Sequence, residues 1–599
     1  MIWILLSIIP ALFLWAVLYF TLHITIRLGF SLTINHFLVF IIGSVALKKI
    51  ASFLIASYFW EYGFLEGWKI WFICLTVVAV LVMVIRSICD RLITEINTRI
   101  TPLVWLFFAS FVLAVPLSFI QTDNSENVFE SDPAIKKELE TAKGRPNIVL
   151  VVIDTLAALD MQLYGYNRDT TPFISEWAEG SSVFSNLYAS SNWTTASTVS
   201  ILTGQRPWTH KVWYQALYRG SKEQHRSLPY LLKDQGYDLY SFVQNPSAHP
   251  DVLGFEGAFS VREKYYRYWS ENAWWYDRFV EAFYDRPVLE RWIFREYNHI
   301  ALRVLNLFRP ALAETFFPAD LVYDDVLKTV AGDRDVERPF FAWIQVLPPH
   351  DPYLPPAPYL GRYGNGDVFK TDEFQSGLIH IEYEKSDQPK IDDLRRRYDE
   401  FIRYSDHEFG EFMTQLEHTV DMNNTVVILV SDHGESFSSG FQGHGSDFMY
   451  ESVIHVPMII KMPSVGQGIK IDTLVEHIDI MPTILDIAAI DIPLWSEGRS
   501  LLPAIKGEEI VTRPVYSMQL IKNRILPEPI IKKGVVAMRS GSLKLIYDIG
   551  MEKSVLYNLD VDPEEQLDIA STLPMVVNEY EYLIKQELKM ANELNERVP

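Results

Sequence analysis

Four residues that could bind a metal or transfer a proton stand within three positions of the end of an apolar run. Asp154 follows one run, His350 follows a second, and the adjacent pair Asp432 and His433 follows a third. A carboxylate beside an imidazole offers the mixed oxygen and nitrogen ligands that suit Zn²⁺ or Mn²⁺. Each residue taken alone has a plainer interpretation, because an Asp after a strand often forms a turn or caps a helix. The chemistry therefore depends on whether the four side chains meet.

The three apolar runs are predicted to be buried strands that bring these residues together. They cover residues 147–153, 340–347 and 425–430, and they are rich in β-branched and aromatic residues. In open α/β sheets, ligands bind at the carboxyl ends of the strands. We therefore expect the four residues to converge at one edge of a sheet.

The composition is that of a folded, acidic protein. Its 599 residues are 49% hydrophobic and 21% charged, and the formal net charge is -22. This argues against disorder, and it excludes nucleic acid as the default partner, because a general nucleic-acid surface needs an excess of Lys and Arg. The two cysteines, Cys74 and Cys89, precede all three predicted strands. A disulfide, a thiolate zinc site or a cysteine nucleophile is therefore excluded from the rest of the chain.

Residues 1–122 are predicted to form a helical membrane domain with five spans, or alternatively four. Its apolar stretches, each near the ~20 residues that cross a bilayer core, lie at about 2–22, 30–47, 50–65, 70–87 and 102–120. Two clusters of basic residues are expected on the cytoplasmic side: Lys48 with Lys49, and Arg86 with Arg91 and Arg99. This topology predicts an integral inner or plasma membrane protein. Its catalytic part, beyond a polar linker at 123–145, would be extracytoplasmic.

Ten blocks of sequence occur in an order that is typical of one enzyme family. The blocks are Pro146–Asp154, Leu163–Pro172, Asn192–Gly204, Pro349–Tyr353, Ser431–Glu435, Gly443–Gly445, His477–Thr483, Gly498–Leu501, Lys544–Tyr547 and Leu556–Pro563. Together they resemble the sulfatase family of the alkaline-phosphatase superfamily. After the membrane domain, the resemblance implies an α/β sulfatase-like catalytic domain with a central mixed sheet at 146–510. A small C-terminal α+β subdomain would follow at 511–599.

Several positions depart from the pattern of this family. Sulfatases that make formylglycine need Cys or Ser where this chain has Thr194, and Pro and Arg where it has Ala196 and Thr198. Thr cannot become formylglycine. The second Asp of the usual sulfatase pair is Thr155, and the usual Asp–Asn metal pair is Asp432–His433. The resulting set is similar to that of membrane-bound phosphoethanolamine and phosphoglycerol transferases.

The resemblance to these transferases implies one divalent metal held by Asp154, Thr194, Asp432 and His433. Zn²⁺ or Mn²⁺ is favoured, with Ca²⁺ as an alternative. Metal coordination would activate Thr194 as the nucleophile, and His350 and His444 would bind ester oxygens or protonate the leaving group. Thr194 could instead be a helix cap, and the two histidines could merely order their loops.

The leading interpretation is a membrane-anchored, metal-dependent transferase. It would move a phospho-alcohol group, of the phosphoethanolamine or phosphoglycerol type, from a membrane phospholipid to an envelope glycan or lipid. The first alternative is a hydrolase of sulfuric or phosphoric esters, and the second is an inactive glycan-binding scaffold. Substrate preference distinguishes the first two interpretations, and an absence of metal binding would mark the third.

Overall fold

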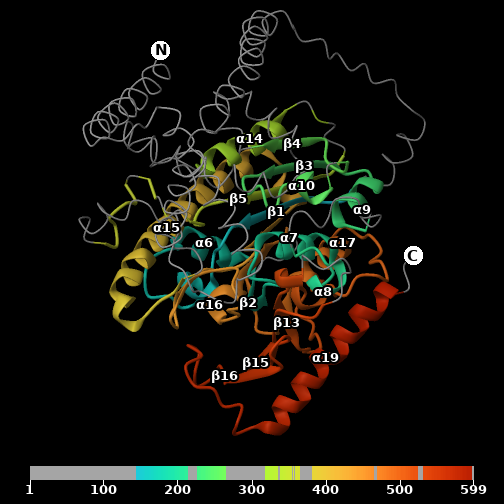
Figure 1. Ribbon diagram of the computed structural model, residues 1–599. Coiled ribbons are helices and arrows are strands. Elements are labelled where there is room, and N and C mark those ends of the chain that lie inside the picture. The colour runs from blue at the N-terminus through green and yellow to red at the C-terminus, as the bar shows by residue number, and fades with distance from the viewer. Residues whose placement is uncertain are drawn as a thin grey trace, which may run out of the picture. The chain divides into compact units, whose positions relative to one another are not determined.

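The computed structural model describes residues 144–596, except for 214–225, 256, 265–317, 333, 335–337, 352, 354, 357, 365–380, 464–467 and 524–530. The chain divides into two compact units, residues 1–130 and 131–599. All of the described residues belong to the second unit, whose helices and strands are labelled in Figure 1.

The predicted fold class is corrected in its membrane part. Among the described residues, no helix is both long enough and apolar enough to cross a bilayer. The longest described helices, α15 (Gln388–Thr419) and α19 (Pro574–Glu596), carry many charged residues, which a bilayer core excludes. The predicted spans in 1–122 and almost all of the linker at 123–145 lie outside the described residues. The structure therefore supports the α/β part of the predicted fold class.

A nine-stranded mixed sheet forms the centre of the described unit (Figure 1). Its strands run in the order β11–β2–β10–β7–β1–β5–β3–β4, and β12 pairs with β2. β1 is parallel to β5 and β7, whereas β10 is antiparallel to β7 and β2. The strands are β1 (Asn147–Ile153), β2 (Ser182–Tyr188), β3 (Asp238–Val243), β4 (Val261–Lys264), β5 (Phe340–Val346), β7 (Thr425–Val430), β10 (His455–Lys461), β11 (Ile469–Ile471) and β12 (Val475–Glu476).

The three predicted strands are β1, β5 and β7, and they lie side by side in the middle of this sheet. Every residue in them is buried. Alternate side chains of β1 point to opposite faces, so Leu150 and Val152 belong to one core cluster whereas Val151 and Ile153 belong to the other. A strand covered on both faces needs a continuous apolar run, which explains the composition of these segments.

Helices cover both faces of the sheet. The first core cluster is completed by α7 (Thr194–Thr203), α9 (Leu228–Asp234), α10 (Pro250–Leu253), α17 (Ile480–Ile487) and α18 (Leu502–Ile505). The second cluster is completed by α6 (Pro172–Trp177), α14 (Ala319–Ala331) and α15. The fold is thus a three-layer α/β arrangement, in which both faces of the sheet are shielded from water.

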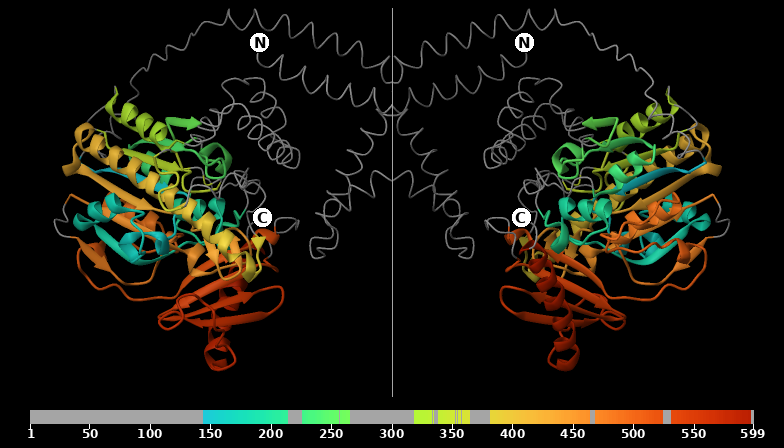
Figure 2. Two further views of the ribbon diagram at one scale, coloured as in Figure 1. Left: turned by 90° about the vertical axis from the view of Figure 1, so that its left-hand side faces the viewer. Right: turned by 90° about the vertical axis from the view of Figure 1, so that its right-hand side faces the viewer.

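A four-stranded antiparallel sheet follows the central sheet in the chain and lies at the bottom of both views in Figure 2. Its strands are β13 (Val515–Gln519), β14 (Val535–Ser540), β15 (Leu543–Asp548) and β16 (Lys553–Asn558). Helix α19 packs on this sheet and shares a core with it, to which α8 (Pro207–His210) adds Trp208. The short helix α16 (Glu451–Ile454) contributes to a smaller cluster between the two sheets.

A small third sheet forms near the carboxyl end of β7. It contains β6 (Ile381–Glu382), β9 (Phe441–Gly443) and β8 (Ser436–Ser438), in that spatial order. β8 and β9 form a hairpin, which returns the chain toward the end of β7. This return decides where His444, the residue after β9, is placed.

Candidate functional site

Asp154, Asp432 and His433 lie at one edge of the central sheet, in loops that follow neighbouring parallel strands. Asp154 directly follows β1, and the Asp432–His433 pair follows β7 after Ser431. All three side chains are fully buried. The backbone N–H of Thr155 donates to Asp432 Oδ1 at 3.3 Å and ties the two loops together. Because parallel neighbours end at the same sheet edge, residues 277 positions apart meet here.

Four possible metal-ligand atoms surround one point at this edge. Measured from His433 Nε2, Thr194 Oγ1 is 3.2 Å away, Asp432 Oδ2 is 3.8 Å away and Asp154 Oδ1 is 3.9 Å away. Metal–ligand bonds of ~2.0–2.2 Å place neighbouring ligands of a tetrahedral ion roughly 3.4 Å apart. These separations fit one divalent cation. The structure therefore brings the four predicted ligands together.

The orientation of the His433 ring agrees with a metal-ligand role. Its Nδ1 lies 3.1 Å from the backbone oxygen of Gly434, an atom that can only accept a hydrogen bond. Nδ1 must therefore carry the ring proton, which leaves the lone pair on Nε2. A backbone carbonyl at the far nitrogen is a usual partner of a metal-binding histidine.

Negative charge at this edge is not fully compensated by the protein. Asp154 Oδ1 is buried and has no hydrogen-bond partner among the described residues. Burial raises the pKa of Asp154, although the nearby His350 ring opposes this effect. Burial, together with the Asp154 carboxylate, raises the pKa of Asp432 to about 7. A divalent cation would supply the missing positive charge and keep both carboxylates ionised.

Thr194 is the first residue of α7, and its side chain does not cap that helix. The capping position is held by Trp193, and no side-chain capping hydrogen bond is formed. Thr194 Oγ1 instead lies near His433 Nε2 and 3.3 Å from Asn245 Nδ2. The first turn of a helix is the positive end of its dipole, which stabilises negative charge on a nearby atom. This position favours an alkoxide on Thr194.

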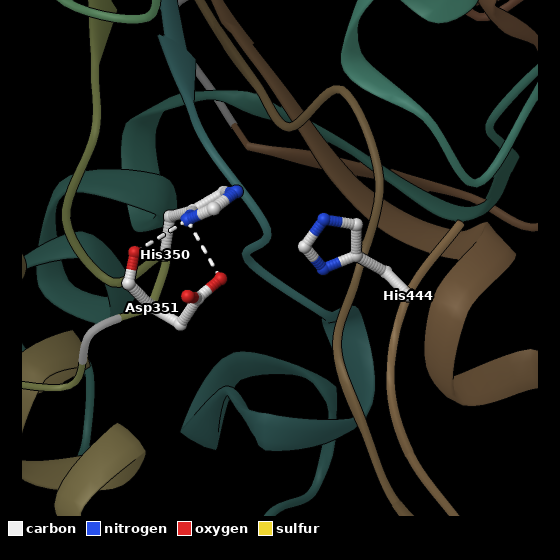
Figure 3. Close-up of side chains that lie close together, drawn as sticks. All are labelled: His350, Asp351 and His444. Carbon is white, nitrogen blue, oxygen red and sulfur yellow. Dashed lines mark hydrogen bonds and ion pairs between the residues drawn. The ribbon is translucent and has the colours of Figure 1, made fainter. Parts of the chain in front are cut away.

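The rings of His350 and His444 face one another, as Figure 3 shows. The centroids of their rings are 4.9 Å apart, and the His444 ring is 4.5 Å from the ring of His433. Each ring has an acceptor at Nδ1: the backbone oxygen of Asp351, 2.7 Å away, for His350, and the Glu435 carboxylate for His444. The Nδ1 of His350 is 3.1 Å from Asp351 Oδ1, and the Nδ1 of His444 is 3.1 Å from both carboxylate oxygens of Glu435. Both predicted catalytic histidines therefore lie at the site.

The surroundings of His350 favour its protonated form. Burial opposes a charge on this ring, but the carboxylates of Asp351 and Asp154 outweigh burial and raise its pKa well above the usual value. A protonated imidazole can bind an anionic ester oxygen and can give a proton to a leaving alcohol. His350, Asp351 and His444 could also hold a cation, since their ligand atoms lie within 4.8 Å of one another.

Two side-chain amides at the site were not among the predicted site residues. Asn245 Nδ2 donates to Asp154 Oδ2 at 2.6 Å as well as to Thr194 Oγ1. Gln345 Nε2 donates to Asp154 Oδ2 at 3.2 Å and to Asp432 Oδ2 at 3.3 Å. An Asn in a loop is too common to signal a site. A single Gln inside the apolar strand β5 is a stronger signal, because a buried amide needs partners.

Comparisons with known proteins agree on one family. A family model described as Sulfatase matches residues 146–490, and a model described as N-sulphoglucosamine sulphohydrolase, C-terminal, matches residues 443–593. The chain is 24% identical over 459 residues to a choline-sulfatase from Rhizobium meliloti, covering 71% of this chain and 83% of that protein. It is 25% identical over 399 residues to an arylsulfatase from Clostridium perfringens, covering 60% and 79%.

The fold is also found among solved structures. The crystal structure of a phosphonate monoester hydrolase from Agrobacterium radiobacter superimposes with a TM-score of 0.55 at 17% identity, covering 75% of this chain and 96% of that one. At this identity the likeness establishes the fold alone. The two curated relatives are both sulfatases. The family models and these relatives therefore favour the alternative prediction, ester hydrolysis, over the predicted phosphotransferase, and an enzyme over an inactive scaffold.

Proposed function

Because this chain belongs to the sulfatase family, whose members are metal-using ester hydrolases, we propose that it hydrolyses a singly charged phosphorus ester with Thr194 as the nucleophile. The substrate class would be a phosphodiester or a phosphonate monoester. One observation carries the proposal. Thr194 Oγ1 lies 3.2 Å from His433 Nε2, beside two buried carboxylates, in the position where a sulfatase of the formylglycine type needs Cys or Ser.

The charges at the site support an ester with one negative charge. The groups that act most strongly on Asp154, Asp432 and His350 are carboxylates, imidazoles and amides, and within the described part of the chain no Lys or Arg is prominent among them. A phosphate monoester, with two negative charges, would meet repulsion from these carboxylates. A phosphodiester or a phosphonate monoester carries a single charge, which one divalent cation and a protonated His350 can balance.

A threonine nucleophile separates phosphorus esters from sulfate esters. An ester on Thr194 Oγ1 has no second hydroxyl on the same carbon that could expel the bound group. The group must therefore leave by a second attack at its central atom, and in-line displacement at phosphorus provides such a route. For this reason we place phosphorus esters ahead of sulfate esters.

The residues at the site suffice for two successive displacements. A divalent cation held by Asp154, Thr194, Asp432 and His433 would supply a Lewis acid that favours ionisation of the Thr194 hydroxyl. Thr194 Oγ1, its proton released to solvent, attacks phosphorus while the bond to the leaving alcohol breaks. His350 protonates the leaving oxygen.

The second displacement reverses these roles. A water molecule attacks phosphorus, and the neutral imidazole of His350 takes up its proton. The bond between phosphorus and Thr194 Oγ1 breaks, and the hydroxyl regains a proton from solvent. His444, turned toward His350 and held by Glu435, is placed to bind a non-bridging oxygen throughout.

The proposal is tested by comparing a phosphodiester, a phosphonate monoester, a phosphomonoester and a sulfate ester with the full-length protein in Mn²⁺ or Zn²⁺. We expect the first two to be the best substrates. Thr194→Ala should lower kcat/KM about 10³–10⁴-fold. Thr195→Ala is the matched control on the same helix, because the Thr195 hydroxyl donates to the backbone oxygen of Ser247. Turnover of the sulfate ester alone, or full activity of Thr194→Ala, would reject the proposal.

The predicted lipid donor and glycan or lipid acceptor stay predictions. Transfer and hydrolysis would share the ester on Thr194 and differ only in the second nucleophile, an alcohol or water. Adding a polyol to the same assay separates them: transfer yields a new phosphodiester in place of the hydrolysis product, and hydrolysis alone leaves the polyol unmodified.

A further inference from the structure

Gln345 stands out in the central sheet because it is a polar residue in an otherwise apolar strand. β5 reads Phe-Phe-Ala-Trp-Ile-Gln-Val, and all seven residues are buried. Gln345 pairs in register with Val152 of β1 on one side and with Val243 of β3 on the other. A buried amide in such a position weakens a strand unless it finds partners.

The partners of Gln345 are the two carboxylates of the candidate metal centre. Its Nε2 donates to Asp154 Oδ2 at 3.2 Å and to Asp432 Oδ2 at 3.3 Å, so each amide hydrogen is directed at one carboxylate. Ionised carboxylates only accept hydrogen bonds, which means that the nitrogen and not the oxygen of the amide must face them. The other amide atom, Oε1, is buried and has no hydrogen-bond partner among the described residues.

This arrangement is a poor choice for stability alone. The unpaired Oε1 is a desolvated acceptor, and an apolar residue at this position would avoid that cost. Residues that lower the stability of the fold, such as a buried amide with an unpaired oxygen, occur mainly at functional sites. The benefit is visible at Asp154, where Gln345 and Asn245 both bind Oδ2 and leave Oδ1 on the side of His433 Nε2, 3.9 Å away.

We propose that Gln345 is a positioning residue of the metal centre, which holds Asp154 and Asp432 in the geometry that receives the cation. The inference rests on the proposed function, because it presumes a metal at Asp154, Thr194, Asp432 and His433. Gln345 separates two like charges with a dipole and fixes which oxygen of Asp154 faces the metal. It does not contact the reacting atoms, so its effect passes through the carboxylates.

Metal affinity is the measurement that tests this role. Full-length protein is stripped with a chelator and titrated with Mn²⁺ by calorimetry, as the wild type and as Gln345→Met, which keeps the length of the side chain and removes both donors. We expect the Kd for Mn²⁺ to rise about 10–100-fold, as for other residues that orient metal ligands. Ser241→Ala is the matched control: Ser241 is buried on the adjacent strand β3, in register with Trp343 of β5. Its Kd should equal that of the wild type.

The outcomes separate the two proposals. If Gln345→Met binds Mn²⁺ as tightly as the wild type, the positioning role is wrong, whatever the Tm of the variant. A lower Tm of the metal-free variant with an unchanged Kd would likewise show a purely structural role. If Gln345→Met does not fold, as judged by circular dichroism, Gln345→Leu replaces it in the same titration. A wild type that binds no metal would reject the proposed function itself.

Kinetics provide a second readout. At saturating Mn²⁺, Gln345→Met should recover most of the wild-type kcat, because excess metal compensates for weaker binding. A kcat that stays low at every Mn²⁺ concentration would contradict a role in metal binding.

Discussion

Buried carboxylates are compensated in different ways at the edge of the central sheet and at its junction with the C-terminal sheet. At the junction, Lys544 is fully buried and lies 2.9 Å from Glu451 and 2.7 Å from Glu565. At the sheet edge, Asp154 and Asp432 face imidazoles and amides, and Asp154 Oδ1 has no hydrogen-bond partner among the described residues.

The difference separates buried charges that the chain itself compensates from buried charges that a bound cation would compensate. A lysine supplied by the chain neutralises the junction permanently, at the desolvation cost common to buried ion pairs. The sheet edge has ligand atoms at metal-binding separations, and no Lys or Arg is prominent among the described groups that act on Asp154 and Asp432. Breaking each region should therefore have a different consequence: loss of function at the edge and loss of stability at the junction.

The largest effect is expected at the sheet edge. Asp432→Asn removes a charged ligand, and we expect kcat/KM to fall at least ~10³-fold while the fold persists. The measurement is turnover of the best phosphorus ester, with metal content determined on the same sample. Wild-type protein treated with a chelator is the control and should lose activity to a similar degree, with recovery when metal is returned. Normal metal content and activity in Asp432→Asn would contradict the assignment of the site.

At the junction, removing the buried lysine should lower the stability of the protein. Lys544→Met leaves Glu565 buried without its lysine and leaves Glu451 with the Arg539 guanidinium alone, 3.4 Å from its Oε2. We expect the free energy of unfolding to fall by about 3–5 kcal/mol at pH 8. The loss should be smaller at pH 5, because burial raises the pKa of Glu565 to about 7 and its carboxyl is protonated there. Denaturant titration measures both values.

The control for this variant is Lys589→Met, which removes a lysine from an exposed ion pair with Glu593, 3.7 Å away. A surface pair contributes ~0–1 kcal/mol, so this change should be nearly neutral. Turnover per folded molecule should survive in Lys544→Met. A loss of activity without a loss of stability would overturn the distinction between the two regions.

The smallest effect concerns a carboxyl that has like-charged neighbours. Burial, together with Asp320 and Glu411, raises the pKa of Glu408 on α15 from 4.5 to about 7. Because the folded pKa is above the unfolded one, the folded state binds more protons between these values, and stability falls as pH rises through that window.

Glu408→Gln should therefore raise the Tm above pH 7 and have little effect below pH 4.5. Since the group is partly solvated, the gain should be no more than about 1 kcal/mol. Thermal unfolding at pH 4.5, 6 and 8 measures it, with the exposed Glu417→Gln as the control. A gain that is equal at all three pH values would exclude relief of charge repulsion as its cause.

The local pattern of the chain was enough to find the three central strands. The predicted runs at 147–153 and 425–430 coincide with β1 and β7, and the run at 340–347 is one residue longer than β5. Strands buried on both faces must be continuously apolar, so the ends of the apolar runs predict the ends of the strands. The prediction of a membrane domain relied on the same kind of apolar pattern, but it concerns residues that the structure does not describe.

The residues of the candidate site fall into two groups. Asp154 and the Asp432–His433 pair could be predicted because each ends a recognisable strand and parallel strands end together. Thr194, in contrast, emerged only from the resemblance to a family, since a Thr in a Thr- and Ser-rich segment has no distinctive pattern of its own.

The sequence by itself therefore determined the central strands, the family and the chemical types of the candidate metal ligands. Only the tertiary structure decided that Gln345 joins the two carboxylates, that Asn245 reaches both Asp154 and Thr194, and that a hairpin returns His444 to His350. The physical reason is the range of the interactions. Strand formation and ligand chemistry follow from adjacent residues, whereas hydrogen bonds between side chains depend on which strands become neighbours in the sheet.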